Sequence, residues 1–223
     1  MKSILKTITL ILIVFAFHNC SKYDCDNIVL DDKTLDNVSK EYECYKGINS
    51  IFFLDENGNE YEYTSQFFTE QQDRPFLFSI ECDDKIKEAR YNGDYILRTF
   101  VGPDSTRISF VLSTTFIDGE EEFFERNVVD LLRISIFDST DNFDKIIEQF
   151  QFITSNKDGV VDKSTFNDAK VNFIGDIELH GKNFNSVYEQ IDFNSNPILF
   201  NKTDGVVSFE NKNQIPLLFD RFE

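Results

Sequence analysis

The stretch IFFLDENGNEYEYT, Ile51–Thr64, decides the fold of this chain of 223 residues. Its Asn-Gly pair lies between an apolar run and an alternating run, and that arrangement is the strongest short-range signal for a β-hairpin. After the turn, two tyrosines alternate with two glutamates, so one face of the second strand is apolar and the other is polar. The pattern predicts a half-buried strand of an antiparallel sheet.

The same period of two recurs along the rest of the chain. Segments rich in β-branched and aromatic residues are separated by turn residues, among them Gly102-Pro103-Asp104 and His180-Gly181-Lys182-Asn183. Further strands are predicted over residues 76–82, 95–101, 107–117, 132–136, 171–179, 186–193, 198–200 and 206–210. From Val171 onward this order is a β-meander.

One segment departs from this period. Phe143, Ile146, Ile147 and Phe150 recur at helical spacing behind candidate N-cap residues, which predicts a helix over Asp141–Phe150. We therefore expect a mainly β fold, an antiparallel β-sandwich or half-barrel with meander topology and one or two short helices.

Polarity and length divide the chain into three parts. Residues 1–19 are an apolar leader, and residues 20–45 are polar and charged, as expected of a tether with a short helix near Leu35–Tyr42. Residues 46–223 form the antiparallel β-rich domain, which is long enough for a real hydrophobic core. A polar seam near residues 154–168 leaves open whether this part is one domain or two.

The leader has the features of a secretory signal peptide. Lys2 and Lys6 give it a positive start, and its apolar run, Ile8–Phe17, is much shorter than the ~20 residues of a membrane-spanning helix. Cys20 follows within three residues, which resembles the lipobox of bacterial lipoproteins, and the Ser-Lys pair after it resembles mature lipoproteins of Bacteroidota. The resemblance implies lipid on the Cys20 sulfur, cleavage before Cys20, and anchoring in the outer membrane, on its periplasmic face or at the cell surface. A cleaved secretion signal without lipid and an uncleaved anchor are the alternatives.

Two further patterns resemble features of the same group. The segment ILFNKTDGVVSFEN, Ile198–Asn211, is similar to a C-terminal hairpin of uncharacterised lipoproteins of Bacteroidota, and that resemblance implies no activity. Asp104-Ser105-Thr106 and Asp138-Ser139-Thr140 resemble the D-[ST]-x signal for periplasmic O-glycosylation in Bacteroidota. The resemblance implies modification at Ser105 and Ser139, although Ser139 has a competing use as a helix cap.

Charge excludes one class of partner. The chain carries 40 acidic and 22 basic side chains, a net charge of −18, and loss of the leader removes two of the lysines. Such a surface repels phosphate backbones, so we expect no binding of nucleic acid. It favours solubility or a basic protein partner, for which Glu120-Glu121-Glu122 with Phe123-Phe124 is a candidate loop. The 25 phenylalanines indicate either a cavity for an apolar ligand or simply an aromatic core.

Catalytic and metal-binding motifs are missing or incomplete in this sequence. Beyond the leader the only histidine is His180, which excludes sites built on several imidazoles. No G-x-S-x-G elbow or phosphate-binding loop occurs, and the Asp-Gly and Asn-Gly segments fail the spacing of a calcium loop. We therefore expect no catalytic residue, no metal and no cofactor. Cys25, Cys44 and Cys82 allow one disulfide beside Cys20, and Cys44–Cys82 is the preferred pair because Cys25 lies close to the lipid.

The sequence therefore predicts a cell-envelope lipoprotein whose β-rich part is a non-catalytic binding or scaffold domain. It would reach the membrane through the lipid at Cys20 and recognise a basic protein or an apolar ligand. The alternative is a carrier of an apolar ligand or lipid in a Phe-lined β cavity. A hydrolase that uses two carboxylates is a third hypothesis, because 40 acidic residues make some facing pair inevitable.

Overall fold

The structure is a computed structural model, and it describes residues 33–82, 85–116, 128–140, 144–156, 171–190 and 197–223. The chain divides into a smaller unit, Met1–Val29 with Leu77–Arg90, and a larger unit, Leu30–Phe76 with Tyr91–Glu223. Nearly all described residues belong to the larger unit, which contains every side-chain contact discussed below.

Several predictions fall on residues that the structure does not describe. They are the leader, the lipidated Cys20, the acidic loop at residues 120–124 and most of the seam near residues 154–168. These assignments stay predictions from the sequence.

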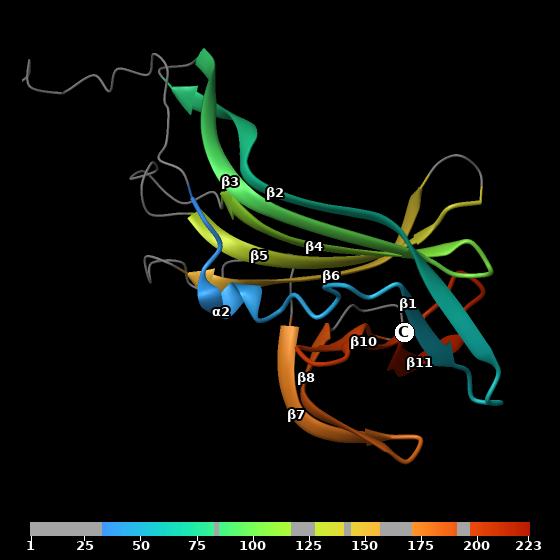
Figure 1. Ribbon diagram of the computed structural model, residues 1–223. Coiled ribbons are helices and arrows are strands. Elements are labelled where there is room, and N and C mark those ends of the chain that lie inside the picture. The colour runs from blue at the N-terminus through green and yellow to red at the C-terminus, as the bar shows by residue number, and fades with distance from the viewer. Residues whose placement is uncertain (1–32, 83–84, 117–127, 141–143, 157–170, 191–196) are drawn as a thin grey trace, which may run out of the picture. The chain divides into compact units, whose positions relative to one another are not determined.

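Eleven strands form one antiparallel sheet (Figure 1). Their bounds are β1 Ser50–Leu54, β2 Glu60–Cys82, β3 Lys85–Val101, β4 Thr106–Phe116, β5 Val128–Asp138, β6 Lys145–Asn156, β7 Val171–Leu179, β8 Lys182–Gln190, β9 Leu199–Asn201, β10 Gly205–Glu210 and β11 Pro216–Phe222. Strands β1–β6 lie side by side in chain order, and so do β7–β11. The sheet is therefore made of two meanders.

The first and last strands join the two meanders. Because β1 pairs with β11, the sheet runs in the order β6-β5-β4-β3-β2-β1-β11-β10-β9-β8-β7. It is nearly closed into a barrel, with β6 and β7 as its edges. Leu132 and Phe150 of one meander share a buried cluster with Val187 and Val206 of the other. The prediction of a mainly β, antiparallel meander fold is confirmed, and the architecture is barrel-like rather than a sandwich.

The hairpin at residues 51–64 has the expected register. Phe53 of β1 lies opposite Tyr61 of β2, and the apolar face of this strand pair is turned to the core. The carboxylate of Asp55 accepts hydrogen bonds from the backbone N–H groups of Asn57 and Asn59 at 2.9 and 2.8 Å. An Asp that caps its own turn in this way stabilises the loop between the strands.

Strand β7 has the predicted bounds, but the turn after it is shorter than expected. His180 and Gly181 both have positive φ, 50° and 80°, as in the two-residue hairpin loop of type I′. Strand β8 therefore begins at Lys182, whereas the sequence predicts Ser186.

The predicted helix over Asp141–Phe150 is wrong wherever the structure describes it. Residues from Lys145 onward belong to β6, and Phe150 lies in the core opposite Ile134 of β5. Ile146 is 52% exposed, although a core-facing helix would have buried it together with Phe150. The ladder of hydrogen bonds to β5 and the β-branched isoleucines favour a strand, and they outweigh the helical spacing.

A strap, residues 33–49, precedes β1 and contains the short helix α2, Asn37–Lys40, where the sequence predicts one. The sequence assigns most of this strap to a polar tether over residues 20–45. In the structure Leu35, Tyr42 and Tyr45 are 3%, 5% and 1% exposed. The strap is therefore part of the hydrophobic core from Leu35 onward, because these three large side chains turn inward, whereas Val38 of α2 is 54% exposed.

Tyr45 lies between the two meanders, inside the near-barrel. Its ring centroid is 5.3 Å from that of Phe100 on β3 and 5.2 Å from that of Phe110 on β4. From the other meander, the backbone N–H of Val206 donates a hydrogen bond to the Tyr45 hydroxyl at 2.7 Å. A Cβ atom on Gly205, which has a φ of +73°, would overlap with that hydroxyl. Glycine is therefore required beside Tyr45.

Candidate functional site

Two buried carboxylates tie the start of the strap to the sheet. The backbone N–H of Leu35 donates to Asp94 of β3 at 3.0 Å, and that of Asp36 donates to Asp130 of β5 at 2.7 Å. Backbone hydrogen bonds between Lys33 and β3 form a short bridge next to them. Because these contacts lie directly ahead of α2, they fix the helix and the residues after it beside the sheet.

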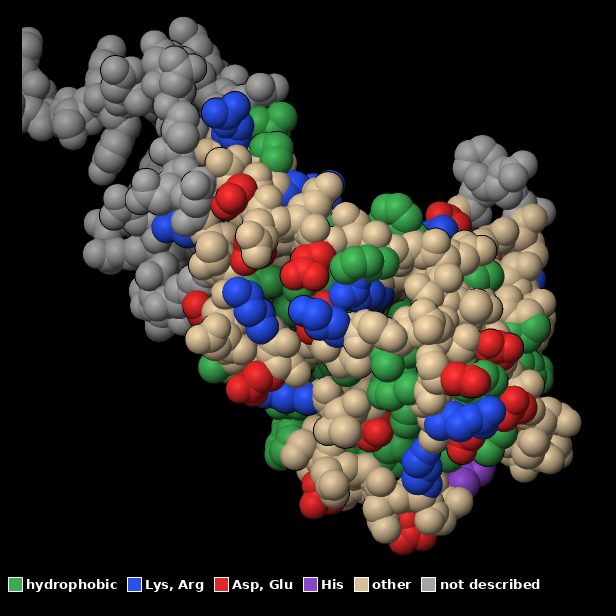
Figure 2. Space-filling model, in the orientation of Figure 1, with side chains coloured by type: hydrophobic (Ala, Val, Ile, Leu, Met, Phe, Trp, Pro, Cys, Tyr) green, Lys and Arg blue, Asp and Glu red, His purple; other side chains and the backbone are tan. Residues whose placement is uncertain are grey.

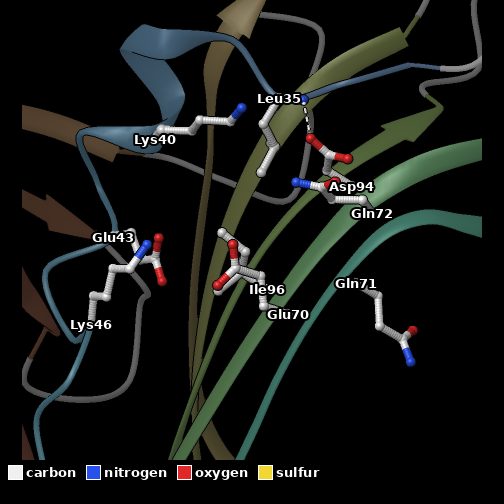
Figure 3. Close-up of a pocket in the computed structure, with 9 residues that line it drawn as sticks. All are labelled: Leu35, Lys40, Glu43, Lys46, Glu70, Gln71, Gln72, Asp94 and Ile96. Atoms are coloured by element: carbon white, nitrogen blue, oxygen red, sulfur yellow. Dashed lines mark hydrogen bonds between the residues drawn. The ribbon is translucent and has the colours of Figure 1, made fainter.

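A pocket of about 320 Å³ opens between the strap and the strands β2 and β3 (Figure 3). Its floor consists of Leu35, Ile96 and Asp94, which are 3%, 4% and 7% exposed. Two of these side chains are apolar and the third is charged. At the floor, a molecule in the pocket therefore meets one buried carboxylate beside two apolar side chains, where electrostatic interactions are stronger than in water.

The carboxylate of Asp94 has a free acceptor. Its Oδ2 accepts the hydrogen bond from Leu35, whereas its buried Oδ1 accepts none from the residues that the structure describes. A buried charged oxygen without a donor is unfavourable, because it has lost its hydration and gained no partner. A donor group on a bound molecule would remove this penalty.

Glu43, which lines the pocket, belongs to a buried ion pair. Arg98 of β3 donates a hydrogen bond to Glu43 of the strap at 2.5 Å, and the two side chains are 5% and 9% exposed. The guanidinium of Arg98 also lies over the ring of Phe68 on β2, 3.3 Å from its centroid. These contacts hold the Glu43 carboxylate in place and neutralise its charge.

The rim of the pocket is basic on one side and acidic on the other. Lys40 and Lys46 come from the strap, and Glu70 and Gln72 come from β2 across the pocket (Figure 3). All four residues are exposed. The face of the molecule in Figure 2 likewise mixes acidic and basic side chains, without a broad field of one sign. The pocket is therefore a dipolar site on a surface of mixed charge.

The two predicted O-glycosylation sites lie in neighbouring turns and do not line this pocket. Ser105 is in the turn between β3 and β4, Ser139 follows β5, and the N–H of Ser139 donates to the carbonyl oxygen of Ser105 at 3.2 Å. In each turn the Asp carboxylate accepts hydrogen bonds from the Thr two residues later. The fold thus brings the two serines together, and their glycosylation stays a prediction.

Cys44 carries a free thiol in the structure, and the side chain of its expected partner, Cys82, lies outside the described residues. Burial is the main cause that raises the pKa of the Cys44 thiol far above its usual value. The thiol is therefore protonated at neutral pH and is a weak nucleophile. Nothing about Cys44 indicates a catalytic role.

Among the described residues, no three His, Cys, Asp or Glu side chains gather closely enough to hold a metal ion. No helix in the described part of the chain has the length and apolar character that a membrane crossing requires. Comparison of the chain with protein-family models, curated proteins and solved structures finds no match.

The sequence did not single out the residues of this pocket, although one signal was present. In GDYILRTF, Gly93–Phe100, the charged Asp94 and Arg98 share the buried face of a strand with Ile96 and Phe100. Charged side chains are almost never fully buried unless they are paired. Their position on an apolar face therefore indicated partners from elsewhere in the chain, which the strap supplies.

Proposed function

We propose that this chain is a non-catalytic binding domain of a cell-envelope lipoprotein and that the pocket beside the strap holds a small polar ligand. The observation that carries the proposal is the buried, unpaired Oδ1 of Asp94 on the pocket floor. The volume of about 320 Å³ is at the small end of ligand sites, which span roughly 300–1,000 Å³. A ligand with a hydrogen-bond donor would fill the pocket and supply the missing hydrogen bond to the Asp94 carboxylate.

The lining of the pocket favours binding over catalysis. The described residues that line it include no serine, cysteine or histidine, which are common nucleophiles and proton carriers. Glu43 is paired with Arg98, and Glu70, the other carboxylate of the described lining, is exposed on the rim. The lining therefore offers no second buried and unpaired carboxylate to act with Asp94 in the two-carboxylate chemistry of a glycosidase. These features support a domain that holds its ligand unchanged.

Packing of the core supports a polar ligand over an apolar one. The rings of Phe53, Tyr63 and Phe209 contact one another edge to face, with centroid distances of 5.1–5.7 Å. Phe150 and Phe200 approach to 5.7 Å in the same core cluster. Rings packed in this way fill space with one another. The many phenylalanines are then a property of the core, which favours the pocket over a Phe-lined cavity as the ligand site.

The membrane anchor in this proposal is the lipid on Cys20, in the outer membrane and facing the periplasm or the cell surface. Stable anchoring needs more than one acyl chain, which full lipoprotein processing supplies. Because the strap is packed in the core, residues 21–32 separate the lipid from the domain. A ligand site next to the strap would then lie on a domain held close to the membrane.

Native mass spectrometry of the full chain tests both halves of the proposal. In protein made by a host that processes lipoproteins and extracted in mild detergent, we expect a chain that begins at Cys20 and carries acyl groups. We also expect a small polar molecule retained without a covalent bond. Cys20→Ser should abolish acylation, and Asp94→Asn should release the molecule while acylation is unchanged.

Two outcomes would contradict the proposal. A cleaved chain with an unmodified Cys20 would remove the lipoprotein assignment. A retained mass that is the same in the wild type and in Asp94→Asn would remove the assignment of the pocket.

A further inference from the structure

We propose that the pocket binds a free amino acid with an aliphatic side chain, or a dipeptide of such residues, by its ammonium and carboxylate groups. The inference rests on the proposed function, since it names the chemical class of the ligand for the same pocket. Three features carry it: a buried carboxylate with a free oxygen, two lysines across from it, and an apolar floor.

Asp94 provides the site for the ammonium group. A hydrogen bond between two ionised groups is roughly twice as strong as one between neutral groups, so the free Oδ1 favours a cationic donor. An ammonium has three N–H donors. Glu70 and Gln72 of β2 also line the pocket and offer acceptors for the remaining two. A primary ammonium would therefore donate one hydrogen bond to Asp94 at the floor and would have acceptors at the rim for its other two N–H groups.

Lys40 and Lys46 provide the site for the carboxylate. Both line the pocket from the strap, and neither forms an ion pair with a residue that the structure describes. A purely cationic ligand would leave these two charges without a partner. A purely anionic ligand would be repelled by Asp94 and Glu70. A zwitterion is complementary to both ends of the pocket.

The floor and the volume restrict what lies between the two charged groups. Leu35 and Ile96 are apolar and almost fully buried, and they offer a surface against which an aliphatic side chain can pack. The volume of about 320 Å³ suits a ligand of one or two residues. No aromatic ring belongs to the described lining, so the pocket has no platform on which a nucleobase would stack.

Isothermal titration calorimetry of the full chain with L-valine and L-alanyl-L-alanine tests the inference. We expect saturable binding of both zwitterions. Binding should be weaker by about tenfold or more for N-acetyl-L-valine, which lacks the ammonium, and for L-valinamide, which lacks the carboxylate. The inference is overturned if neither zwitterion binds or if the blocked compounds bind as well as L-valine.

Variants of Asp94 and of the two lysines test which side chain binds the ammonium of the ligand and which bind its carboxylate. Asp94→Asn keeps an oxygen for the Leu35 N–H but loses the charge, so it should weaken the binding of L-valine by about tenfold or more. It should not weaken the binding of N-acetyl-L-valine, which has no ammonium and is repelled by the Asp94 charge. Lys40→Gln combined with Lys46→Gln should weaken the binding of L-valine to a similar degree, and it should not weaken the binding of L-valinamide, which has no carboxylate. Both lysines are exposed, so this double variant tests the pocket without disturbing the core.

Asp130→Asn is the matched control. Asp130 also accepts a backbone hydrogen bond from the strap, at 2.7 Å, but it does not line the pocket. Its variant should bind L-valine like the wild type. Equal losses of binding in Asp94→Asn and Asp130→Asn would show that the strap had merely loosened, and would overturn the assignment of the ammonium to Asp94.

Native mass spectrometry separates failure of this inference from failure of the proposed function. Only the inference fails if the zwitterions do not bind and the chain still retains a small molecule that Asp94→Asn releases. Both fail if the zwitterions do not bind and Asp94→Asn changes no retained mass.

Discussion

Replacing Tyr45 with alanine should lower the free energy of unfolding by about 3–5 kcal/mol, the usual effect of deleting a large buried aromatic side chain. Tyr45 is 1% exposed and contacts the rings of Phe100, Phe110 and Phe222. The substitution leaves a cavity between the two meanders and removes the acceptor for the backbone N–H of Val206. Urea unfolding followed by circular dichroism should show a lower midpoint with an unchanged slope.

Tyr45→Phe is the matched control for this prediction. It keeps the ring and removes only the hydroxyl, so it should cost about 1–3 kcal/mol through the unsatisfied N–H of Val206. If Tyr45→Ala instead changes stability by less than about 0.5 kcal/mol, as a typical surface substitution does, the strap is not part of the core. Residues 20–45 would then form the tether that the sequence predicts.

Replacing Arg98 with methionine should lower the free energy of unfolding by about 3–5 kcal/mol, since it leaves the Glu43 carboxylate buried without a cation. Nη2 of Arg98 lies 2.5 Å from Oε1 of Glu43, and the two side chains are 5% and 9% exposed. The double variant Arg98→Met with Glu43→Leu removes both charges. It should regain most of the lost stability, because apolar residues of similar volume can replace a buried ion pair at little cost. Chemical denaturation of the single and double variants measures the coupling between the two side chains.

The exposed pair of Arg221 and Glu60 is the control for the buried pair. Nη1 of Arg221 lies 2.7 Å from Oε2 of Glu60, but the two side chains are 47% and 45% exposed. Arg221→Met should therefore cost only about 0–1 kcal/mol. Equal effects of the substitutions at Arg98 and Arg221 would contradict the burial of the Glu43–Arg98 pair, which holds Glu43 at the pocket.

Strands could be predicted where apolar and polar residues alternate without interruption. The bounds of β7 agree to the residue although Phe173 and Ile174 interrupt the alternation, because turn residues follow directly at His180-Gly181. Strand β2 is predicted as two pieces, at residues 61–64 and 76–82, because the polar segment between them has no alternation. Strand β11 is missed because it begins at a proline and has two adjacent leucines, although only Leu217 and Phe219 of this strand are fully buried.

The strap and the pocket could not be predicted because they depend on segments far apart in the sequence. The spacing of Leu35, Tyr42 and Tyr45 fits a short helix, but their burial requires an interior that exists only once both meanders have formed. The pocket requires the same arrangement, since Asp94 comes from a strand and Glu43 from the strap. Local pattern carries no information about such contacts.

Amide hydrogen exchange at Leu35 and Val206 tests most directly whether the strap belongs to the folded domain. The N–H of Leu35 donates to the carboxylate of Asp94, and that of Val206 donates to the hydroxyl of Tyr45. We predict that both amides are protected as strongly as those of the central strand β4, which exchange only when the core opens. Exchange of the Leu35 amide at the rate of an unstructured chain, with β4 still protected, would contradict the packed strap and the pocket that is built on it.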